Sequence, residues 1–215
     1  MVRLVKIWLA LSLLLGASLS SFSAIHDTGG SNTSSSLKIT VRLYIEAPVS
    51  LRTINQAKKL TTHIFQKVGV DILWLDCRIS PAQLSPDPAC RHLLGPAEIV
   101  LTVSPQAAHL GLRGGACGFA YQSEEVEFNK YAEVYYDCVE KVAHGGTIAP
   151  HQILGYVIAH EIGHLLLNDR DHSFLGIMRA SWNRQDLEDA ARGVLSFTKL
   201  EAHSIQANAI ARIGR

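Results

Sequence analysis

Three histidines and a glutamate lie close together in one stretch of this sequence, Y-V-I-A-H-E-I-G-H-L-L-L-N-D-R-D-H-S-F-L-G-I-M, which runs from residue 156 to residue 178. His160 and His164 are four residues apart, so on an α-helix both imidazoles project from the same face and can reach one metal ion. Glu161 projects to the side of that face, where its carboxylate can act as a base without being a ligand. The spacing therefore predicts a metal site with a carboxylate beside it.

Zinc suits imidazole ligands, and catalytic zinc commonly has three protein ligands and an open fourth position. His172 is the third ligand that we expect. Zinc lowers the pKa of a water molecule to roughly 7, and Glu161 would take a proton from this water and pass it to a leaving amine. Asp169 or Asp171 could replace His172 as a ligand or close the site, and Glu188, on a later segment, is a further candidate.

The alternative interpretation is a helix that contains histidines by chance. That interpretation does not explain Glu161, whose neighbours are almost all apolar, because an unpaired carboxylate is costly to bury. For His172 to reach the metal, the helix must end sharply after His164. Asn168 provides the stop, because asparagine readily takes the left-handed conformation that terminates helices. Met178 would then lie on a tight turn under the metal.

These residues resemble the metzincin clan of zinc metallopeptidases, whose pattern is H-E-x-x-H-x-x-G-x-x-H followed by a methionine turn. The sequence departs from the pattern in two places. Asn168 replaces the helix-ending glycine, and the third histidine comes two residues late, so that Arg170 occupies its standard position. The short distance from His172 to Met178 resembles the archaemetzincin-like branch, although the cysteines that bind a second zinc in that branch are missing here.

The resemblance implies an α+β fold of the metzincin-like zincin type, with a mixed twisted sheet, a zinc-binding active-site helix and a C-terminal helix. It also implies a substrate strand along an edge of the sheet, Met178 as an apolar floor, and a pocket beyond the scissile bond that is lined by Ile177 to Trp182. Some metzincins carry a tyrosine two residues after the methionine. That position is Ala180 here, so its role in stabilising the oxyanion is not carried over.

The elements that must position these residues are indicated by apolar periodicity. Alternation predicts strands, and helical spacing predicts a helix before the second strand. Pro150 suits the first turn of the active-site helix, and Thr198 with Glu201 forms a capping box that opens a last helix. The expected strands are 37–45, 70–77, 97–103 and 133–139, and the expected helices are 51–68, 150–167 and one from residue 198 onward.

The N-terminus has the character of a secretory signal peptide, with basic Arg3 and Lys6 followed by an apolar run from Ile7 to Leu15 and then small residues. A membrane anchor is the alternative, but the apolar run is shorter than the roughly 20 residues of a spanning helix. We expect a signal peptide at 1–24, a Gly/Ser/Thr-rich linker at 25–36 and a catalytic domain at 37–215, located outside the cytoplasm as a secreted or periplasmic protein.

Four cysteines in an exported chain favour two disulfides. Of the three possible pairings we favour Cys77 with Cys90, closing a proline-rich loop, and Cys117 with Cys138, joining neighbouring strands; free buried cysteines are the alternative. The formal net charge of +1 gives no reason to expect nucleic acid as a partner.

The sequence therefore predicts a secreted, monomeric zinc endopeptidase that acts on peptides or proteins and is not inserted in a membrane once the signal is removed. Its metal ligands would be His160, His164 and His172, and Glu161 would be its general base. The alternatives are a non-catalytic secreted binding module with a structural metal, which a fourth protein ligand would close, and a zinc hydrolase or amidase acting on a non-protein substrate.

Overall fold

The structure is a computed structural model, and it describes residues 37–78, 88–106, 116–145 and 148–215. The expected signal peptide at 1–24 and linker at 25–36 lie outside these residues. Within the described residues, no helix is long and apolar enough to cross a membrane.

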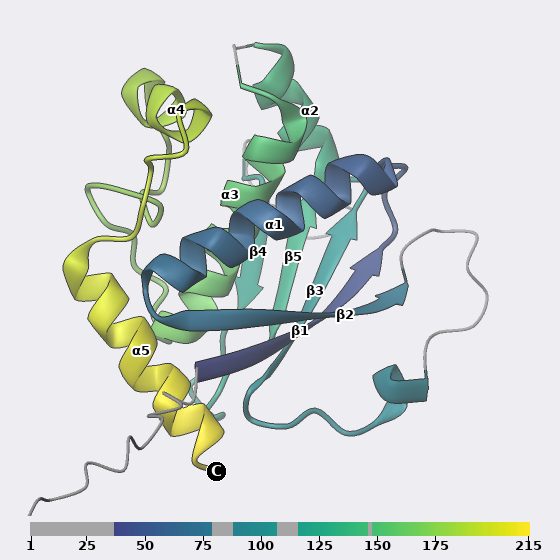
Figure 1. Cartoon of the computed structure of the whole chain (residues 1–215), viewed down its shortest axis with the longest axis vertical. Helices are drawn as coiled ribbons and strands as arrows, with labels where there is room; N and C mark the ends of the chain where they lie inside the picture. The colour runs from purple at the N-terminus through teal and green to yellow at the C-terminus, as the bar shows by residue number, and fades with distance from the viewer. Residues whose placement is uncertain (1–36, 79–87, 107–115, 146–147) are drawn as a thin grey trace, which may run out of the picture. The chain divides into compact units, whose positions relative to one another are not determined.

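A five-stranded mixed sheet forms the framework of the described residues, in the strand order β2-β1-β3-β5-β4 (Figure 1). Strands β2, β1, β3 and β5 run parallel to one another, whereas β4 is antiparallel to β5 and lies at one edge. Among the described residues, no strand pairs with the outer side of β4. The strands are β1 (Leu37–Ile45), β2 (Val70–Arg78), β3 (Glu98–Ser104), β4 (Gly118–Tyr121) and β5 (Tyr131–Tyr135).

The helices begin where the sequence supplies caps. The side chain of Ser50 accepts a hydrogen bond from the backbone N–H of Thr53, and Pro150 occupies the first turn of α3, where its missing N–H would have no partner. Thr198 and Glu201 form the expected capping box. The helices are α1 (Leu51–Lys67), the short 3-10 helix η1 (Pro88–Arg91), α2 (Tyr136–His144), α3 (Pro150–Leu167), α4 (Arg184–Ala191) and α5 (Lys199–Ile213).

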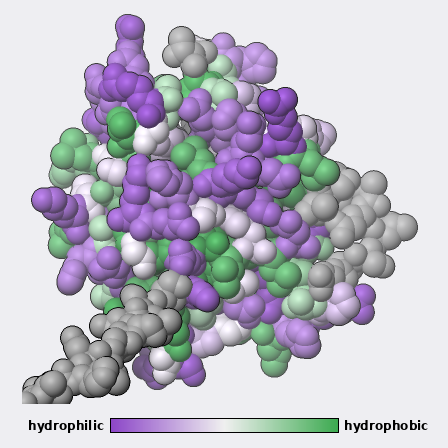
Figure 2. Space-filling model, viewed as in Figure 1, coloured by the Kyte–Doolittle hydropathy of each residue, from purple (hydrophilic) through white to green (hydrophobic). Residues whose placement is uncertain are grey.

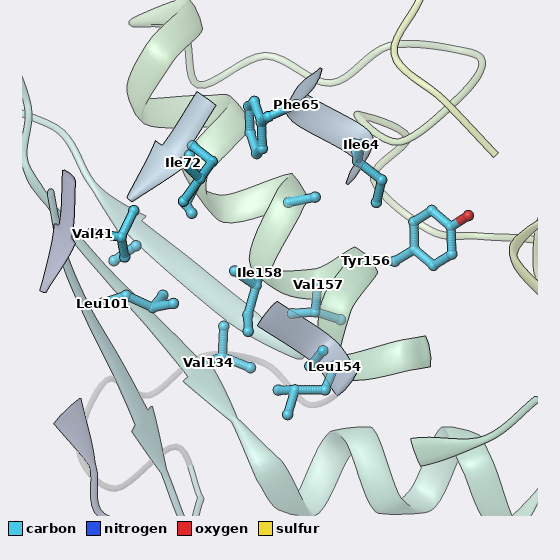
Figure 3. Close-up of a cluster of buried hydrophobic side chains, with 14 of the residues drawn as sticks. Val41, Ile64, Phe65, Ile72, Leu101, Val134, Leu154, Tyr156, Val157 and Ile158 are labelled. Carbon is cyan, nitrogen blue, oxygen red and sulfur yellow. The ribbon is translucent and has the colours of Figure 1, made fainter. Parts of the chain in front are cut away.

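The core lies between one face of the sheet and helices α1 and α3 (Figure 3). Alternate strand residues such as Val41, Leu101 and Val134 point into it, as the period of a strand requires. Helix α3 is apolar on all sides and is buried along most of its length, which is typical of a central helix. The predicted α+β class, with a mixed sheet, a central helix and a C-terminal helix, is confirmed.

Three elements differ from the prediction. The strand expected at 133–139 ends at Tyr135, and the chain continues as α2, which carries an ion pair between Asp137 and Lys141 at 2.9 Å. Strand β4 has four residues and helix α4 has eight, too few for a clear periodicity. These differences matter for function, because all three elements border the cleft described below.

Both predicted disulfides are present. Cys77 pairs with Cys90 and Cys117 pairs with Cys138, with Cα–Cα distances of 5.6 and 5.1 Å. The second bridge does not join two strands, because Cys138 lies on α2 and Cys117 directly precedes β4. It therefore fastens α2 to the edge of the sheet.

The surface in Figure 2 is mostly hydrophilic, with apolar side chains in scattered positions. Some of the most exposed large apolar residues, Phe174 and Leu175, belong to the loop between His172 and Met178.

Candidate metal centre and active-site cleft

Helix α3 presents His160 and His164 on one face, one turn apart, and His172 returns to them from the following loop. The Nε2 atom of His164 lies 3.1 Å from that of His160 and 3.3 Å from that of His172. Their ligand atoms all lie within 4.8 Å of one another, and no other group of three or more histidine, cysteine or acidic residues in the described ranges has this proximity. The three histidines that the sequence singled out therefore meet at one point.

The chain can turn back because α3 ends at a residue in the left-handed conformation. Asn168 has φ 53° and ψ 38°, and it is the one non-glycine residue with a positive φ among those described. Its side-chain oxygen accepts a hydrogen bond from Asn129 at 2.9 Å, which ties this turn to the segment before β5. The helix stop expected at Asn168 is confirmed, and it is what brings His172 within reach of α3.

Backbone carbonyls fix the orientation of the two helical histidines. The Nδ1 atom of His160 lies 2.7 Å from the carbonyl oxygen of Ile177, and that of His164 lies 2.8 Å from the carbonyl oxygen of Asp169. Each Nδ1 must therefore carry the proton, which leaves the Nε2 lone pairs directed at each other. Two lone pairs about 3 Å apart repel unless a cation lies between them, so this donor set fits a metal ion.

Burial keeps these imidazoles neutral. Desolvation and the neighbouring His164 lower the pKa of His160 to about 4, and desolvation also lowers the pKa of His164. Neutral imidazoles are the form that binds metals, so His160 and His164 would not need to lose a proton to bind a metal at pH 7.

Glu161 lies on α3 beside the histidines, and its side chain faces Gly118, the first residue of β4. Glu161 is 5% exposed, and this burial raises the pKa of its carboxyl group to about 8. A Cβ atom placed on Gly118 would lie 2.5 Å from Oε1 of Glu161, so the glycine makes room for this carboxylate. The edge strand and the candidate base are thus in direct contact.

Met178 supports the site from below. It is 1% exposed, and a Cβ atom on Gly163 would lie 2.6 Å from its sulfur. Because Gly163 precedes His164 on α3, the methionine packs directly against the helix that carries the two histidines. The adjoining Ile177 carbonyl accepts hydrogen bonds from both His160 and Trp182, which holds the methionine segment against the site.

A cleft of about 670 Å³ opens over these residues. Its walls are the edge strand, helix α3 and the segment after Met178, and α2 and α4 each add one apolar side chain. Of the segment expected to line it, Ile177 to Trp182, the residues Arg179 to Trp182 do so, whereas Ile177 and Met178 are buried. The lining residues are Ala116, Cys117, Gly118, Phe119, Ala120, Gln122, Val142, Val157, His160, Glu161, His164, Arg170, His172, Arg179, Ala180, Ser181, Trp182 and Leu187.

Two of the three alternative ligands, Asp169 and Glu188, have other partners for their side chains. A side-chain oxygen of Asp169 accepts a hydrogen bond from the backbone N–H of Asp171 at 2.9 Å. Glu188 pairs with Arg184 on helix α4 at 3.0 Å. None of these three acids belongs to the histidine group.

The cleft also contains residues that the sequence did not single out as functional, notably Gln122, Val142 and Leu187. Gln122 donates to the carbonyl oxygens of His164 and Asp169, at 2.8 and 2.9 Å. It lies more than 40 residues away from them in sequence, and no local pattern signals such a contact.

The fold is similar to those of two solved structures. A zinc-dependent peptidase from Methanocorpusculum labreanum has a TM-score of 0.52 and 17% identity, over 77% of this chain and 99% of that chain. Archaemetzincin from Methanopyrus kandleri has a TM-score of 0.51 and 15% identity, over 83% of this chain and 97% of that chain. No protein-family model and no curated protein matches the sequence. The metzincin-like fold predicted from the motif is therefore confirmed.

Proposed function

We propose that this protein is a zinc-dependent endopeptidase. One observation carries the proposal: the Nε2 atoms of His160, His164 and His172 converge beside the buried carboxyl group of Glu161, at the floor of an open cleft. Two proteins of similar fold are named as a zinc-dependent peptidase and as archaemetzincin, which supports the same activity.

The three Nε2 atoms would hold the zinc ion, which, when bound, supplies a Lewis acid that activates water and polarises the carbonyl group of the substrate. The Ile177 and Asp169 carbonyls keep the imidazoles of His160 and His164 in the correct tautomer and orientation. In the part of the chain that the structure describes, no fourth side chain joins this group, which favours a catalytic site over a closed structural one.

Glu161 would move the proton. Its carboxylate accepts a proton from the attacking water and donates it to the nitrogen of the scissile amide, so that the amine leaves neutral and the carboxylate is restored. In the site without a bound ion, burial raises the pKa of Glu161 to about 8, which makes its carboxylate a stronger base than an exposed one. A group that exchanges its proton near neutral pH is suited to both halves of this transfer.

The edge strand β4 would bind the backbone of the substrate. Its outer side has no strand neighbour in the described sheet, and an extended peptide can pair with such an edge through main-chain hydrogen bonds. Beyond Glu161, the cleft is walled by Val142, Val157, Trp182 and Leu187. This apolar pocket, as we call these four residues, suits a large apolar side chain of the substrate.

We also propose that the protein is exported and acts as a monomer. The basic and apolar N-terminal segment is the sequence feature that supports export, and two disulfides are compatible with an oxidising compartment.

The test combines zinc content with cleavage of a quenched peptide library. The natural protein should bind one zinc ion and cleave peptides, Glu161→Ala should keep the zinc and lose cleavage, and His172→Ala should lose both. His203→Ala, which removes an exposed histidine on α5, is the matched control and should change neither. If the natural protein binds zinc fully but cleaves no peptide, the binding module or a hydrolase of non-protein substrates is favoured instead. If His172→Ala still binds zinc fully, His172 is not a ligand.

A further inference from the structure

The loop that displaces the third histidine gives the cleft a cationic side chain. After Asn168, a side-chain oxygen of Asp169 accepts a hydrogen bond from the backbone N–H of Asp171 at 2.9 Å. This contact spans two residues and closes a turn of the type that aspartate favours. Arg170 lies at the middle of the turn, is exposed, and lines the cleft. The two-residue displacement therefore puts Arg170 at the sequence position of the third histidine in the metzincin pattern, while His172 lies beside the other two histidines.

A hydrogen bond holds Arg170 at the end of the edge strand. Its Nη2 atom donates to the carbonyl oxygen of Gln122 at 2.7 Å, and the side chain of Gln122 donates back to the carbonyl oxygen of Asp169 at 2.9 Å. The two residues thus clamp the turn to β4. A guanidinium has five N–H donors, and the bond to Gln122 is the one that Arg170 makes through its side chain within the described part of the chain. Further donors can reach a ligand in the cleft.

Arg170 also differs from Arg179, the other arginine of the cleft, in having no counter-ion among the described residues. Arg179 lines the same cleft, but it pairs with Asp186 at 3.1 Å. The carboxylates of Asp169 and Asp171, which flank Arg170 in sequence, line a neighbouring hollow and not this cleft, and neither forms an ion pair with Arg170 among the described residues. Glu161 is buried beside Gly118, at the other end of β4. An anion that enters this part of the cleft would therefore meet a guanidinium that no carboxylate engages in an ion pair.

The two ends of the cleft have opposite character. The apolar pocket lies toward the N-terminal half of α3 and toward α2 and α4, whereas Arg170 lies past the C-terminal end of α3. Along β4, Gly118 contacts Glu161 and Gln122 contacts Arg170, a separation of four residues or about 13 Å of extended chain. A substrate strand paired with β4 would place its scissile bond near the first contact and another side chain near the second.

We propose that Arg170 binds an acidic side chain of the substrate, roughly two to four residues from the scissile bond and on the side away from the apolar pocket. The substrate class is then a peptide with a glutamate or aspartate on one side of the scissile bond and a large apolar residue on the other. This inference rests on the proposed peptidase function. A carboxylate is the natural partner, because it matches the fork of the guanidinium and forms a charge-assisted hydrogen bond with it.

The test uses matched quenched peptides that differ by one pair of isosteric residues, glutamate and glutamine. The varied residue, glutamate or glutamine, stands second, third or fourth from the scissile bond, on its N-terminal side in one set of peptides and on its C-terminal side in the other. Phenylalanine flanks the scissile bond. The natural protein, Arg170→Gln and Arg170→Glu are compared. Arg184→Gln is the control, because Arg184 is an arginine on α4 with a 93% exposed side chain and does not line the cleft. The readout is the ratio of kcat/KM for the glutamate peptide to that for the glutamine peptide.

We expect a ratio of about ten in one chain direction for the natural protein and for Arg184→Gln, since a hydrogen bond between charged groups contributes about that factor. The ratio should fall to about one in Arg170→Gln and below one in Arg170→Glu. It should also decrease as salt is raised toward 1 M, where the Debye length is only about 3 Å.

Two results overturn the inference on its own. One is efficient cleavage with a ratio near one in the natural protein, and the other is a preference for glutamate that survives in Arg170→Gln. Absence of cleavage of every peptide by the zinc-loaded protein would refute the peptidase itself, and this inference with it.

Discussion

Gly118 offers a test of how closely the edge strand fits the candidate base. A Cβ atom at this position would lie 2.5 Å from Oε1, 2.7 Å from Cγ and 2.8 Å from Cδ of Glu161. Ordinary contact with a Cβ atom begins at 3.4 Å, so Gly118→Ala requires a displacement of about 0.9 Å. Because Cγ and Cδ are also too close, rotation of the carboxylate alone does not relieve the overlap. The whole side chain or the strand must move.

The expected cost follows from the sensitivity of catalysis to position. A misplacement of about 1 Å can lower a rate by about 10²-fold, so we expect Gly118→Ala to reduce kcat/KM about 100-fold on the best peptide of the library. Zinc content should not change, because the overlap involves Glu161 and not the histidines. Gly145→Ala is the control, since its Cβ atom would meet nothing closer than the Lys141 carbonyl oxygen at 3.6 Å.

Steady-state kinetics and zinc analysis on the same preparations decide the outcome. Unchanged kcat/KM in Gly118→Ala would mean that Glu161 is not positioned by β4, and the reasoning would be wrong. Loss of zinc together with activity would locate the effect in the metal site and would equally contradict the argument.

Three further predictions follow from the geometry of the site. Asn168→Ala should lower the free energy of unfolding by about 1–2 kcal/mol, because alanine lacks the polar side chain through which asparagine tolerates the left-handed conformation and accepts a hydrogen bond from Asn129. Asn168→Gly should cost less, because glycine adopts this conformation without strain; urea unfolding compares the two. Gln122→Ala should weaken zinc binding about 10- to 100-fold in a chelator competition, because it removes the donor that holds the Asp169 carbonyl against His164. A zinc affinity equal to that of the natural protein would refute this role of Gln122. In the metal-free protein, burial raises the pKa of Glu161 from 4.5 to about 8. Between these two values the folded state retains a proton that the unfolded state releases, so the folded state loses stability as the pH rises. The free energy of unfolding should therefore fall by about 2 kcal/mol between pH 6.5 and 8. Glu161→Gln should abolish that decline, and an equal decline in both proteins would assign it to other groups.

Local rules were sufficient for the parts of the fold in which one short segment determines its own structure. The helix stop at Asn168 and the cap at Thr198 depend on neighbouring residues and on allowed backbone angles, and both are confirmed. His160 and His164 share a helix face because of their spacing alone. The return of His172 then required only that the helix stop where it does.

Other features depend on contacts between distant segments. The run from Glu133 to Val139 is rich in residues that favour strands, yet a helix begins at Tyr136 once the chain has left the sheet. Gly118 contacts Glu161 only because β4 pairs with β5 as an edge strand. No periodicity within β4 contains that information, so this wall of the cleft could not be predicted from the sequence.

The disulfide between Cys117 and Cys138 fastens the start of the edge strand to α2, and both Cys117 and Val142 of α2 line the cleft. The histidines, by contrast, are held by α3 and its following loop. Reduction is therefore expected to loosen the apolar end of the cleft while the metal ligands stay in place. Selectivity for peptides would then depend on the redox conditions of the compartment, and a cytosolic preparation could bind zinc fully while showing the wrong preference.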